Sequence, residues 1–324
     1  MGVVSKQIFE LEKTVIEGDG VNWNELHYEF FQNFDSENTR KCYLRDIKQF
    51  YSFIQRVPRL ESLLNVRRLH IVSYRDFLSS QDQAPKTICR KFSALSSYFD
   101  FLVEKGLFEM NPCTSVKRPR QSTVTPTNDL SDEQVEQLLK TVDQADNLMH
   151  QVVIYLLFFT GIRKQELINL KNGDFFKKGD MNLVNIVGKG KKQVTKVVDS
   201  SVMEKINAYK SDLSFQNIFL GNDDPLIIPT KNPINPKHII KSINPKSVDY
   251  IFKLYCRKAG IFHRVSPHSA RASYIGSALD NGANLLHVSV DVGHSNVKTT
   301  QEYNKRRQSI KDSPVKKLGF NKTR

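Results

Sequence analysis

A polar segment near the middle of the chain separates two parts with different patterning, and this separation constrains the fold more than any other feature. Residues 120–129 contain proline and several threonines but show no helical or strand periodicity, which predicts an interdomain linker. A chain of 324 residues is long enough for two domains with separate cores. We therefore predict an N-terminal domain over residues 1–119 and a second domain over residues 130–324.

The N-terminal part has the apolar spacing of amphipathic helices. Residues 38–55 place Tyr43, Ile47 and Phe50 on one face, and residues 86–105 repeat this pattern. Cations occupy the other side of each segment. Such a face is often only solvated, but two basic faces on neighbouring helices of a cationic protein favour contact with DNA. The residues that we predict to contact DNA, two of them outside these helices, are Arg40, Lys41, Lys86, Thr87, Arg90, Lys91, Arg118 and Lys191.

The C-terminal part changes from helical to strand periodicity and back. The apolar residues 152–159 suit a buried helix that ends at Gly161. From residue 182, apolar and polar side chains alternate around a Gly-Lys-Gly turn, which predicts a β-hairpin. Helical patterns return at residues 245–259 and continue toward residue 292. The expected fold is therefore mainly α with one small β-sheet (α+β).

The charge balance points to a polyanionic partner. The chain carries 48 Lys and Arg against 34 Asp and Glu, which gives a formal net charge of +14. Nucleic acid is the commonest partner of such a protein, and a membrane surface is a less common one. The sequence has no apolar run as long as a membrane span, and its first residues carry charge too early for the secretory leader that we would otherwise consider. A well-solubilised enzyme without a polyanionic partner also fits the charge. We expect a cytoplasmic protein that binds nucleic acid and no membrane.

The four cysteines are widely scattered along the chain, without a CxxC pair. This spacing indicates reduced structural thiols rather than a disulfide framework or a zinc site. No other pattern indicates a prosthetic group. We therefore expect no cofactor and no metal.

Four short motifs in the C-terminal part carry the candidate chemistry. They are TGIRKQE at residues 160–166, GKGKK at 188–192, HSAR at 268–271 and VGHSNVKTTQEY at 292–303. Cleaving a phosphodiester without a metal requires groups that stabilise extra negative charge, and the permanently charged, fork-shaped guanidinium suits this task. Taken singly, Arg163 is more often a surface charge and His294 a capping or packing residue. The order and spacing of the motifs therefore carry the prediction.

This order resembles the signature of the tyrosine recombinase (phage integrase) family, which includes Xer-type and lambda-type enzymes. The 26 positions from His268 to His294, and the nine from there to Tyr303, are similar to the spacing of Xer-type members. The helical N-terminal part resembles, more loosely, the family's SAM-like core-binding domain. The resemblance implies a site-specific recombinase whose two domains close as a C-shaped clamp around DNA.

The resemblance also implies a reaction and an assembly. Such an enzyme cleaves DNA through a 3′-phosphotyrosine intermediate, needs neither metal nor ATP, and exchanges strands through a Holliday junction. Protomers on two DNA sites would form a homotetramer. Accessory DNA-bending or directionality proteins are further partners that the family implies.

Five residues would bind the phosphate or support its binding, according to the resemblance. Arg163 and Arg271 would clamp the phosphate, and Glu166 would hold Arg163 in place. His294 would donate a hydrogen bond to a phosphate oxygen. His268, one helical turn before Arg271, would assist proton removal from the nucleophile or bind the phosphate.

Tyr303 would be the nucleophile, and its chemistry fits the residue types around it. Deprotonating a tyrosine at neutral pH costs roughly 4 kcal/mol because its pKa is about 10. Nearby cations and a histidine reduce this cost. The resemblance makes Lys189 the general acid that protonates the leaving 5′ oxygen, although Lys191 and Lys192 lie in the same turn.

Two other functions fit part of this pattern. A type IB topoisomerase uses the same tyrosine chemistry, but such enzymes generally carry lysine where this chain has His268. A DNA-binding regulator could keep the fold without catalysis, but the complete set of residues argues against it. A recombinase is therefore the first expectation.

Overall fold

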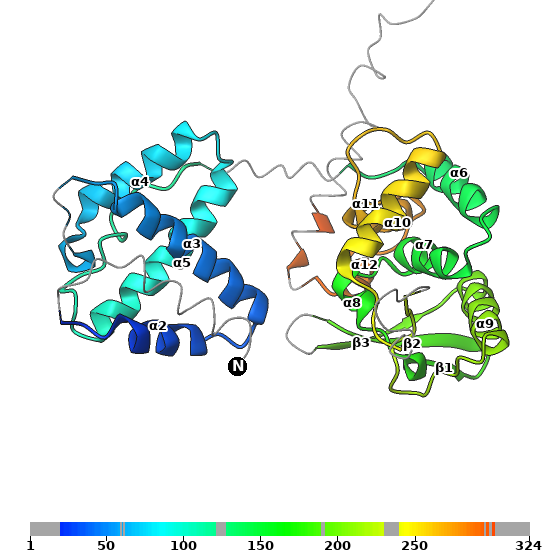
Figure 1. Cartoon of the computed structure of the whole chain (residues 1–324). Coiled ribbons are helices and arrows are strands. Elements are labelled where there is room, and N and C mark those ends of the chain that lie inside the picture. Colours follow the sequence, from blue (N-terminus) through cyan, green and yellow to red (C-terminus); the bar gives the residue numbers. More distant parts are fainter. Residues whose placement is uncertain are drawn as a thin grey trace, which may run out of the picture. The chain divides into compact units, whose positions relative to one another are not determined.

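Figure 1 shows the computed structural model, which describes residues 20–58, 60, 62–120, 128–188, 192–229, 240–294, 296–297 and 300–301. The chain divides into two compact units, residues 1–125 and 126–324. Helices dominate, and the described residues form one three-stranded sheet. The predicted α+β class is therefore confirmed. The bounds of the predicted linker stay a prediction, because residues 121–127 lie outside the described residues.

The first unit is helical throughout its described elements. These are α2 (Trp23–Gln32), α3 (Glu37–Ile54), η1 (Leu63–Asn65), α4 (Arg68–Ser80) and α5 (Pro85–Glu104). The Ser36 side chain accepts the Thr39 N–H and so begins α3. Pro85 begins α5, at a position where its missing N–H would have no helical partner. The two predicted amphipathic helices are confirmed as α3 and α5.

Aromatic side chains fill the core of the first unit. Phe30 and Phe50 are at most 2% exposed, and the rings of Phe30 and Tyr98 meet edge to face at 5.1 Å. One polar cluster lies among them: His27 Nε2 is 3.0 Å from Tyr51 Oη and 2.9 Å from Tyr98 Oη. Burial lowers the pKa of His27 to about 4, so this imidazole is neutral at pH 7.

The second unit combines a small antiparallel sheet with a helical core. Its elements are α6 (Asp132–Asp143), α7 (Leu148–Thr160), α8 (Lys164–Ile168), η2 (Asn172–Asp174), β1 (Phe175–Lys178), β2 (Met181–Val187), β3 (Gln193–Val197), α9 (Ser200–Phe215), α10 (Pro245–Lys258), α11 (Pro267–Asp280) and α12 (Leu285–Asp291). The strand order is β1-β2-β3, and β2–β3 is the predicted hairpin. The alternation criterion does not detect β1, because its sequence, FFKK, does not alternate.

Helix α7 lies within the second unit (Figure 1) and ends shortly before Arg163. It packs against α6, α9, α10 and α11, and nearly all of its side chains are buried. The helix ends at Gly161, whose φ of +56° is left-handed. A Cβ at this position would lie 2.6 Å from the Tyr274 ring. Only glycine fits both demands, and the turn it allows places Arg163 directly after the helix.

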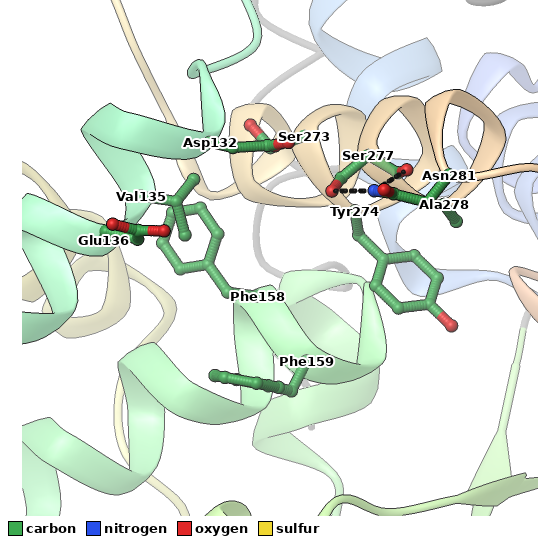
Figure 2. A pocket seen from close by; sticks show the side chains of 10 residues that line it. All are labelled: Asp132, Val135, Glu136, Phe158, Phe159, Ser273, Tyr274, Ser277, Ala278 and Asn281. Atoms are coloured by element: carbon green, nitrogen blue, oxygen red, sulfur yellow. Dashed lines mark hydrogen bonds between the residues drawn. The ribbon is translucent and has the colours of Figure 1, made fainter.

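A pocket of about 450 Å³ lies between α6, the end of α7 and α11 (Figure 2). Phe158 and Phe159 line one side of it, and Tyr274 and Ala278 line the other. Glu136 also lines it, from α6. The pocket is therefore mainly apolar.

The described residues contain neither a membrane-spanning helix nor a candidate metal cluster. Among them, no helix is long and apolar enough to cross a membrane. The same part of the chain contains no group of three or more His, Cys, Asp or Glu side chains placed to hold a metal ion. The four cysteines are free thiols.

Candidate active site

Arg163 lies where α7 gives way to α8, and Glu166 holds it there. The Arg163 N–H donates to Glu166 Oε2 at 2.9 Å, and its Nη1 donates to Glu166 Oε1 at 2.7 Å. The Arg163 side chain is 37% exposed, whereas that of Glu166 is 10% exposed. The remaining terminal nitrogen, Nη2, donates to the Gly293 carbonyl at 3.0 Å. A fixed guanidinium thus faces solvent at this position.

Arg271 projects from α11 into the interior and is 1% exposed. Its Nη1 donates to the Gly161 carbonyl at 2.7 Å, and its Nη2 donates to the Val292 carbonyl. These two acceptors are neutral backbone carbonyls, and the bonds fix the position of the guanidinium. The side chain also connects the end of α7 to the turn after α12.

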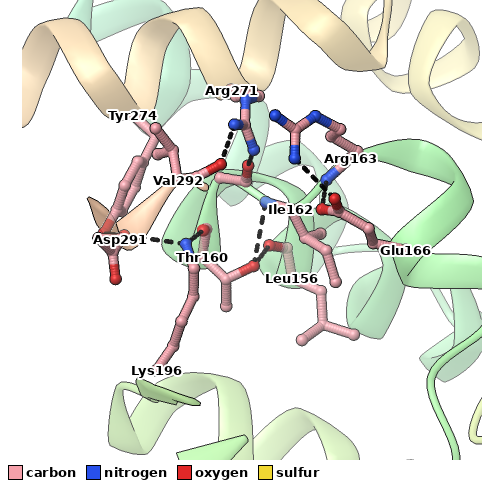
Figure 3. Close-up of polar contacts among 11 residues, drawn as sticks. Leu156, Thr160, Ile162, Arg163, Glu166, Lys196, Arg271, Tyr274, Asp291 and Val292 are labelled. Carbon is pink, nitrogen blue, oxygen red and sulfur yellow. Dashed lines mark hydrogen bonds and ion pairs between the residues drawn. The ribbon is translucent and has the colours of Figure 1, made fainter. Parts of the chain in front are cut away.

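The two arginines meet at one turn of the chain. Arg163 and Arg271 donate to the carbonyls of the consecutive residues Gly293 and Val292. Figure 3 shows the two guanidinium groups next to each other. Gly293 has a left-handed φ of +61°, and a Cβ there would make ordinary contact with Arg163 Nη1 at 3.7 Å. Residues that are far apart in the sequence therefore form a single cationic centre.

His294 follows this turn and is neutral at pH 7. Loss of hydration, then the positive charges of Arg271 and Arg163, and last the protonation of His268 lower its pKa to about 4. Its Nδ1 lies 2.8 Å from Thr300 Oγ1. If Nδ1 accepts the threonine proton, Nε2 carries the ring hydrogen and can donate to a phosphate oxygen. This is the tautomer that the predicted role requires.

His268 stands in the first turn of α11, one turn before Arg271, and its side chain is exposed. Partial loss of hydration, followed by the charges of Arg271 and Arg163, lowers its pKa. With Arg163, it lines a pocket of about 320 Å³. Lys164, which is paired with Asp249 at 2.7 Å, also lines this pocket. The pocket thus combines two cations, each paired with a carboxylate, and an imidazole with a lowered pKa.

Two predicted catalytic residues, Lys189 and Tyr303, lie outside the described residues, as does Lys191. The described residues extend up to Gly188, which directly precedes Lys189 in the sequence. Gly188 N–H donates to the Lys192 carbonyl at 2.7 Å across the base of the hairpin, and a Cβ on Gly188 would lie 3.5 Å from Glu166 Oε1. The hairpin turn therefore starts beside the Arg163 site. The roles of the three residues stay predictions.

Two of the predicted DNA contacts in the first unit bond to side chains of the neighbouring amphipathic helix. Arg90 on α5 pairs with Asp46 on α3, and the Asp46 side chain is 2% exposed. Lys91 is 8% exposed and donates to Gln49 Oε1. These contacts join the two helices, so they give Arg90 and Lys91 a structural role that the amphipathic pattern did not indicate. Contact with DNA stays a prediction for both.

The other predicted contacts in the first unit range from half-buried to exposed, and Arg90 itself is 40% exposed. Lys86 is exposed in the first turn of α5, and Thr87 beside it is half-buried. Lys41 pairs with Glu37 at 2.7 Å. The two arginines of this group bond within the unit, Arg40 to the Phe34 carbonyl and Arg118 to Ser93 Oγ.

Sequence reasoning missed three side chains to one side of Arg271 (Figure 3). Lys196 Nζ donates to Asp291 Oδ2 at 2.9 Å, and Tyr274 Oη donates to the same oxygen at 2.8 Å. A signal for Lys196 existed in the alternation of β3. The lysine shares its phase with Val194 and Val198, and it is 5% exposed, so it occupies an inward-facing position.

Comparisons with known proteins cover both units. Residues 128–309 match the model of the phage integrase family, and residues 30–106 match the model of the phage integrase N-terminal SAM-like domain. The chain is 30% identical over 282 residues to tyrosine recombinase XerC of Staphylococcus epidermidis, covering 84% of this chain and 87% of that protein. It is 26% identical over 293 residues to tyrosine recombinase XerD of Listeria monocytogenes, covering 86% and 91%.

Solved structures show a similar fold. XerH recombinase bound to palindromic difH, in a post-cleavage complex, gives a TM-score of 0.68 at 15% identity and covers 97% of this chain and 95% of that one. A lambda integrase tetramer bound to a Holliday junction gives a TM-score of 0.66 at 13% identity and covers 91% and 80%. At such identities the similarity concerns the fold alone.

Proposed function

Because the chain belongs to the phage integrase family, we propose that it is a site-specific DNA recombinase that cuts and rejoins duplex DNA through Tyr303. One observation supports this proposal above the others. Arg163, Arg271, His268 and His294 come from separate parts of the second unit, and they converge on one cationic site. A phosphodiester is the anion that such a site in a DNA-binding protein would hold.

The phosphate would be held by fixed charges and neutral donors. Arg163 is 37% exposed and anchored by Glu166, so its position does not have to be organised during the reaction. Arg271 is buried beneath it and adds positive charge in a region of low dielectric. A direct contact of Arg271 with the phosphate requires a rearrangement when DNA binds. His294, neutral at pH 7, would donate from Nε2.

The proposed reaction exchanges one phosphate ester for another. The Tyr303 oxygen attacks phosphorus, its proton passes to a base such as His268, and the P–O5′ bond breaks. Lys189 protonates the departing 5′ oxygen, and the DNA keeps a 3′-phosphotyrosine link to the protein. The ester bond is conserved, so rejoining requires no ATP. The two guanidinium charges perform the charge stabilisation that a metal ion provides in other enzymes.

Strand exchange requires more than one protomer. Four copies on two DNA sites would exchange strands through a Holliday junction, by analogy with the lambda integrase tetramer that is bound to such a junction. The two units of each protomer would close around double-stranded DNA as a C-shaped clamp. The protein would act on nucleoid DNA in the cytoplasm, and accessory DNA-bending proteins would set the direction of the reaction.

The nucleophile can be tested on DNA that the protein itself selects in cells. DNA that remains attached to the denatured full-length protein is recovered from expressing cells and sequenced, and the site is rebuilt as a nicked suicide duplex. We expect the wild type, with or without EDTA, to form a covalent complex on a denaturing gel. Tyr303→Phe should form none. Tyr250→Phe, which alters a tyrosine that is 64% exposed, should match the wild type.

The outcomes separate the proposal from its rivals. No complex at the recovered site, or a complex with Tyr303→Phe, contradicts the proposed nucleophile and favours a DNA-binding regulator. A protein that relaxes any supercoiled plasmid but never joins two defined sites is a topoisomerase. Loss of cleavage in EDTA contradicts the metal-independent reaction.

The general acid has its own test. Lys189→Ala should block cleavage of an ordinary duplex but not of one with a 5′-bridging phosphorothiolate, because the sulfur leaves without protonation. Lys191→Ala is the matched variant in the same turn. Rescue of the Lys191 variant instead would move the role to that residue.

A further inference from the structure

Two backbone segments frame the cationic site, and cationic side chains connect them (Figure 3). Residues 160–163 leave the end of α7, and residues 291–294 leave the end of α12. Lys196, which enters from β3, donates from Nζ to the Thr160 carbonyl and to Asp291 Oδ2. The lysine therefore bridges the two segments at one end.

The arginines repeat this bridge one residue further along. Arg271 donates to the carbonyls of Gly161 and Val292, which follow directly after the two residues that the lysine holds. Arg163 belongs to the first segment and donates to Gly293 in the second. Three cations thus hold the segments at successive positions, and the series ends at the pocket of the proposed site.

Lys196 is the unexpected member of this cation ladder, which consists of Lys196, Arg271 and Arg163. Its side chain is 5% exposed, and burial lowers its pKa although the charge of Asp291 opposes the shift. A buried ion pair is often no more stabilising than apolar side chains of similar volume. Stability alone is therefore a weak reason for a lysine here. A role in fixing the geometry of the site accounts for it better.

Tyr274 supports the same end of the ladder. Its hydroxyl donates to Asp291 Oδ2 at 2.8 Å, and Lys196 Nζ lies 5.3 Å from the centre of its ring. The ring also packs against Gly161, where no Cβ would fit. Burial and the charge of Asp291 raise the pKa of Tyr274, so the hydroxyl stays a donor. Both segments are thus held by the same group of side chains.

We propose that Lys196, with Asp291 and Tyr274, is a positioning residue that sets the spacing of the two segments and thereby the placement of Arg271 and His294. This inference rests on the proposed recombinase function. Lys196 does not line the pocket beside Arg163 and His268, so it acts through these groups and not on DNA.

Lys196 also connects the β2–β3 hairpin to the two backbone segments, residues 160–163 and 291–294. It lies on β3, the strand that follows the turn containing Lys189. The same side chain therefore anchors the phosphate-binding groups and the strand beside the predicted general acid. A shift of Lys196 should disturb both together.

Three variants separate positioning from a structural role. Lys196→Met removes the cation and leaves the half-buried Asp291 carboxylate without its lysine partner, which can destabilise the fold. The double variant Lys196→Met with Asp291→Asn removes both charges and keeps an oxygen that accepts from Tyr274. Lys177→Met, at an exposed position on β1, is the matched control.

Covalent complex formation is measured in single turnover on suicide duplexes whose scissile group is either a phosphodiester or a methylphosphonate. The methylphosphonate lacks one charged oxygen, so it depends less on the exact placement of cations. We expect the double variant to have the same melting temperature as the wild type. It should nevertheless cleave the phosphodiester about 10- to 100-fold more slowly. On the methylphosphonate, its rate should stay within about threefold of the wild type.

Several results would overturn the proposal. Unchanged cleavage of the phosphodiester, or an equal loss on both substrates, leaves Lys196 without a positioning role. Rescue of Lys196→Met by the 5′-bridging phosphorothiolate makes it the general acid instead. If the wild type forms no covalent complex, the proposed function has failed, and a second measurement tests the frame.

That second measurement is the pKa of His294, followed by NMR of the DNA-free protein. Besides loss of hydration, the charges that lower this pKa are those of Arg271, Arg163 and His268. A change of the pKa in the Lys196 variants would therefore indicate that the two backbone segments have shifted, and not that a neighbouring charge was lost. We expect the pKa of His294 to rise above about 4 in the double variant. In the control Lys177→Met it should remain at about 4. An unchanged pKa in the double variant would contradict the proposal whatever the activity.

Discussion

Two histidines, one in each unit, reach the same pKa of about 4 in different ways. Burial alone lowers the pKa of His27, which lies between the hydroxyls of Tyr51 and Tyr98. For His294, three positively charged or protonatable neighbours add to the loss of hydration. The first histidine lies in a buried polar cluster that it contacts through Nε2, while its buried Nδ1 has no hydrogen-bond partner among the described residues. The second stands where an anion would relieve the accumulated positive charge.

The same contrast extends to the other charges. In the first unit, Arg90 pairs with the buried carboxylate of Asp46, although its own side chain is 40% exposed. In the second unit, Arg271 is 1% exposed and donates to two neutral backbone carbonyls. The difference teaches that the exposure of a cation does not by itself separate structure from function. Pairing with a carboxylate does not either, since Arg163 in the proposed site is paired with Glu166. The second unit differs in that several cations meet at one turn of the chain.

The largest effect is expected from Arg163. Arg163→Gln should slow covalent complex formation about 10²- to 10³-fold, because it removes a fixed charge from the phosphate site. The pKa of His294 should rise while that of His27 stays near 4. The rate is measured on the suicide duplex and the pKa by NMR. Arg257→Gln, an exposed position on α10, is the control. Equal effects of both variants would contradict a specific role for Arg163.

The second effect concerns the stability of the first unit at low pH. His27 has a folded pKa of about 4, below the ordinary value of 6.5, so the unfolded chain binds the proton first. The contribution of neutral His27 to the free energy of unfolding is complete above about pH 6.5 and is lost as the pH falls toward 4. Between pH 7 and pH 4.5 it should decline by about 2 to 3 kcal/mol.

Urea unfolding followed by Trp23 fluorescence measures this loss, since Trp23 is the single tryptophan and lies in the first unit. His27→Leu, which leaves the Tyr51–Tyr98 hydrogen bond intact, should lose less stability over the same pH range. An identical pH dependence in the variant would show that His27 is not neutral in the folded unit.

The third effect separates the two histidines directly. His294→Gln should slow cleavage about 10- to 100-fold, the value of a hydrogen bond to a charged group. It should leave the Trp23 unfolding transition unchanged. His27→Leu should do the reverse, lowering stability while the folded protein cleaves at the normal rate. A His294 variant that cleaves normally would place the histidine outside the phosphate site.

The smallest effect tests the DNA contacts of the first unit. Lys86→Ala should weaken binding a few-fold and reduce the dependence of log affinity on log salt by about 0.9, as expected for one lost phosphate contact. Lys91→Met should leave that slope unchanged, because Lys91 is 8% exposed and bonded to Gln49. Fluorescence anisotropy at several salt concentrations measures both. The opposite ranking would mean that Lys91 leaves its partner to contact DNA.

The sequence was most informative where periodicity or motif order decides the structure. The helices α3 and α5 and the β2–β3 hairpin follow from side-chain spacing, and the family follows from four ordered motifs. The meeting of Arg163 with Arg271 was implied by the resemblance only. No spacing rule states that both would bond to one turn.

The missed features depend on tertiary contacts. The alternation of β3 puts Lys196 in phase with Val194 and Val198, but a lysine is expected at the surface, and no local pattern pairs it with Asp291. Arg90 and Lys91 fall on the cationic side of α5, yet the neighbouring helix supplies Asp46 and Gln49 as partners. Local periodicity records which face is polar. It does not record whether that polar face meets water, DNA or another helix.

We propose that the charges of the second unit stabilise a DNA phosphate while Tyr303 attacks it. The most direct measurement is mass spectrometry of the protease- and nuclease-digested covalent complex formed on the recovered DNA site. We predict a peptide in which Tyr303 carries the 3′-phosphate of the cleaved strand. A nucleotide attached to any other residue, or to the 5′ end of the DNA, would contradict this proposal.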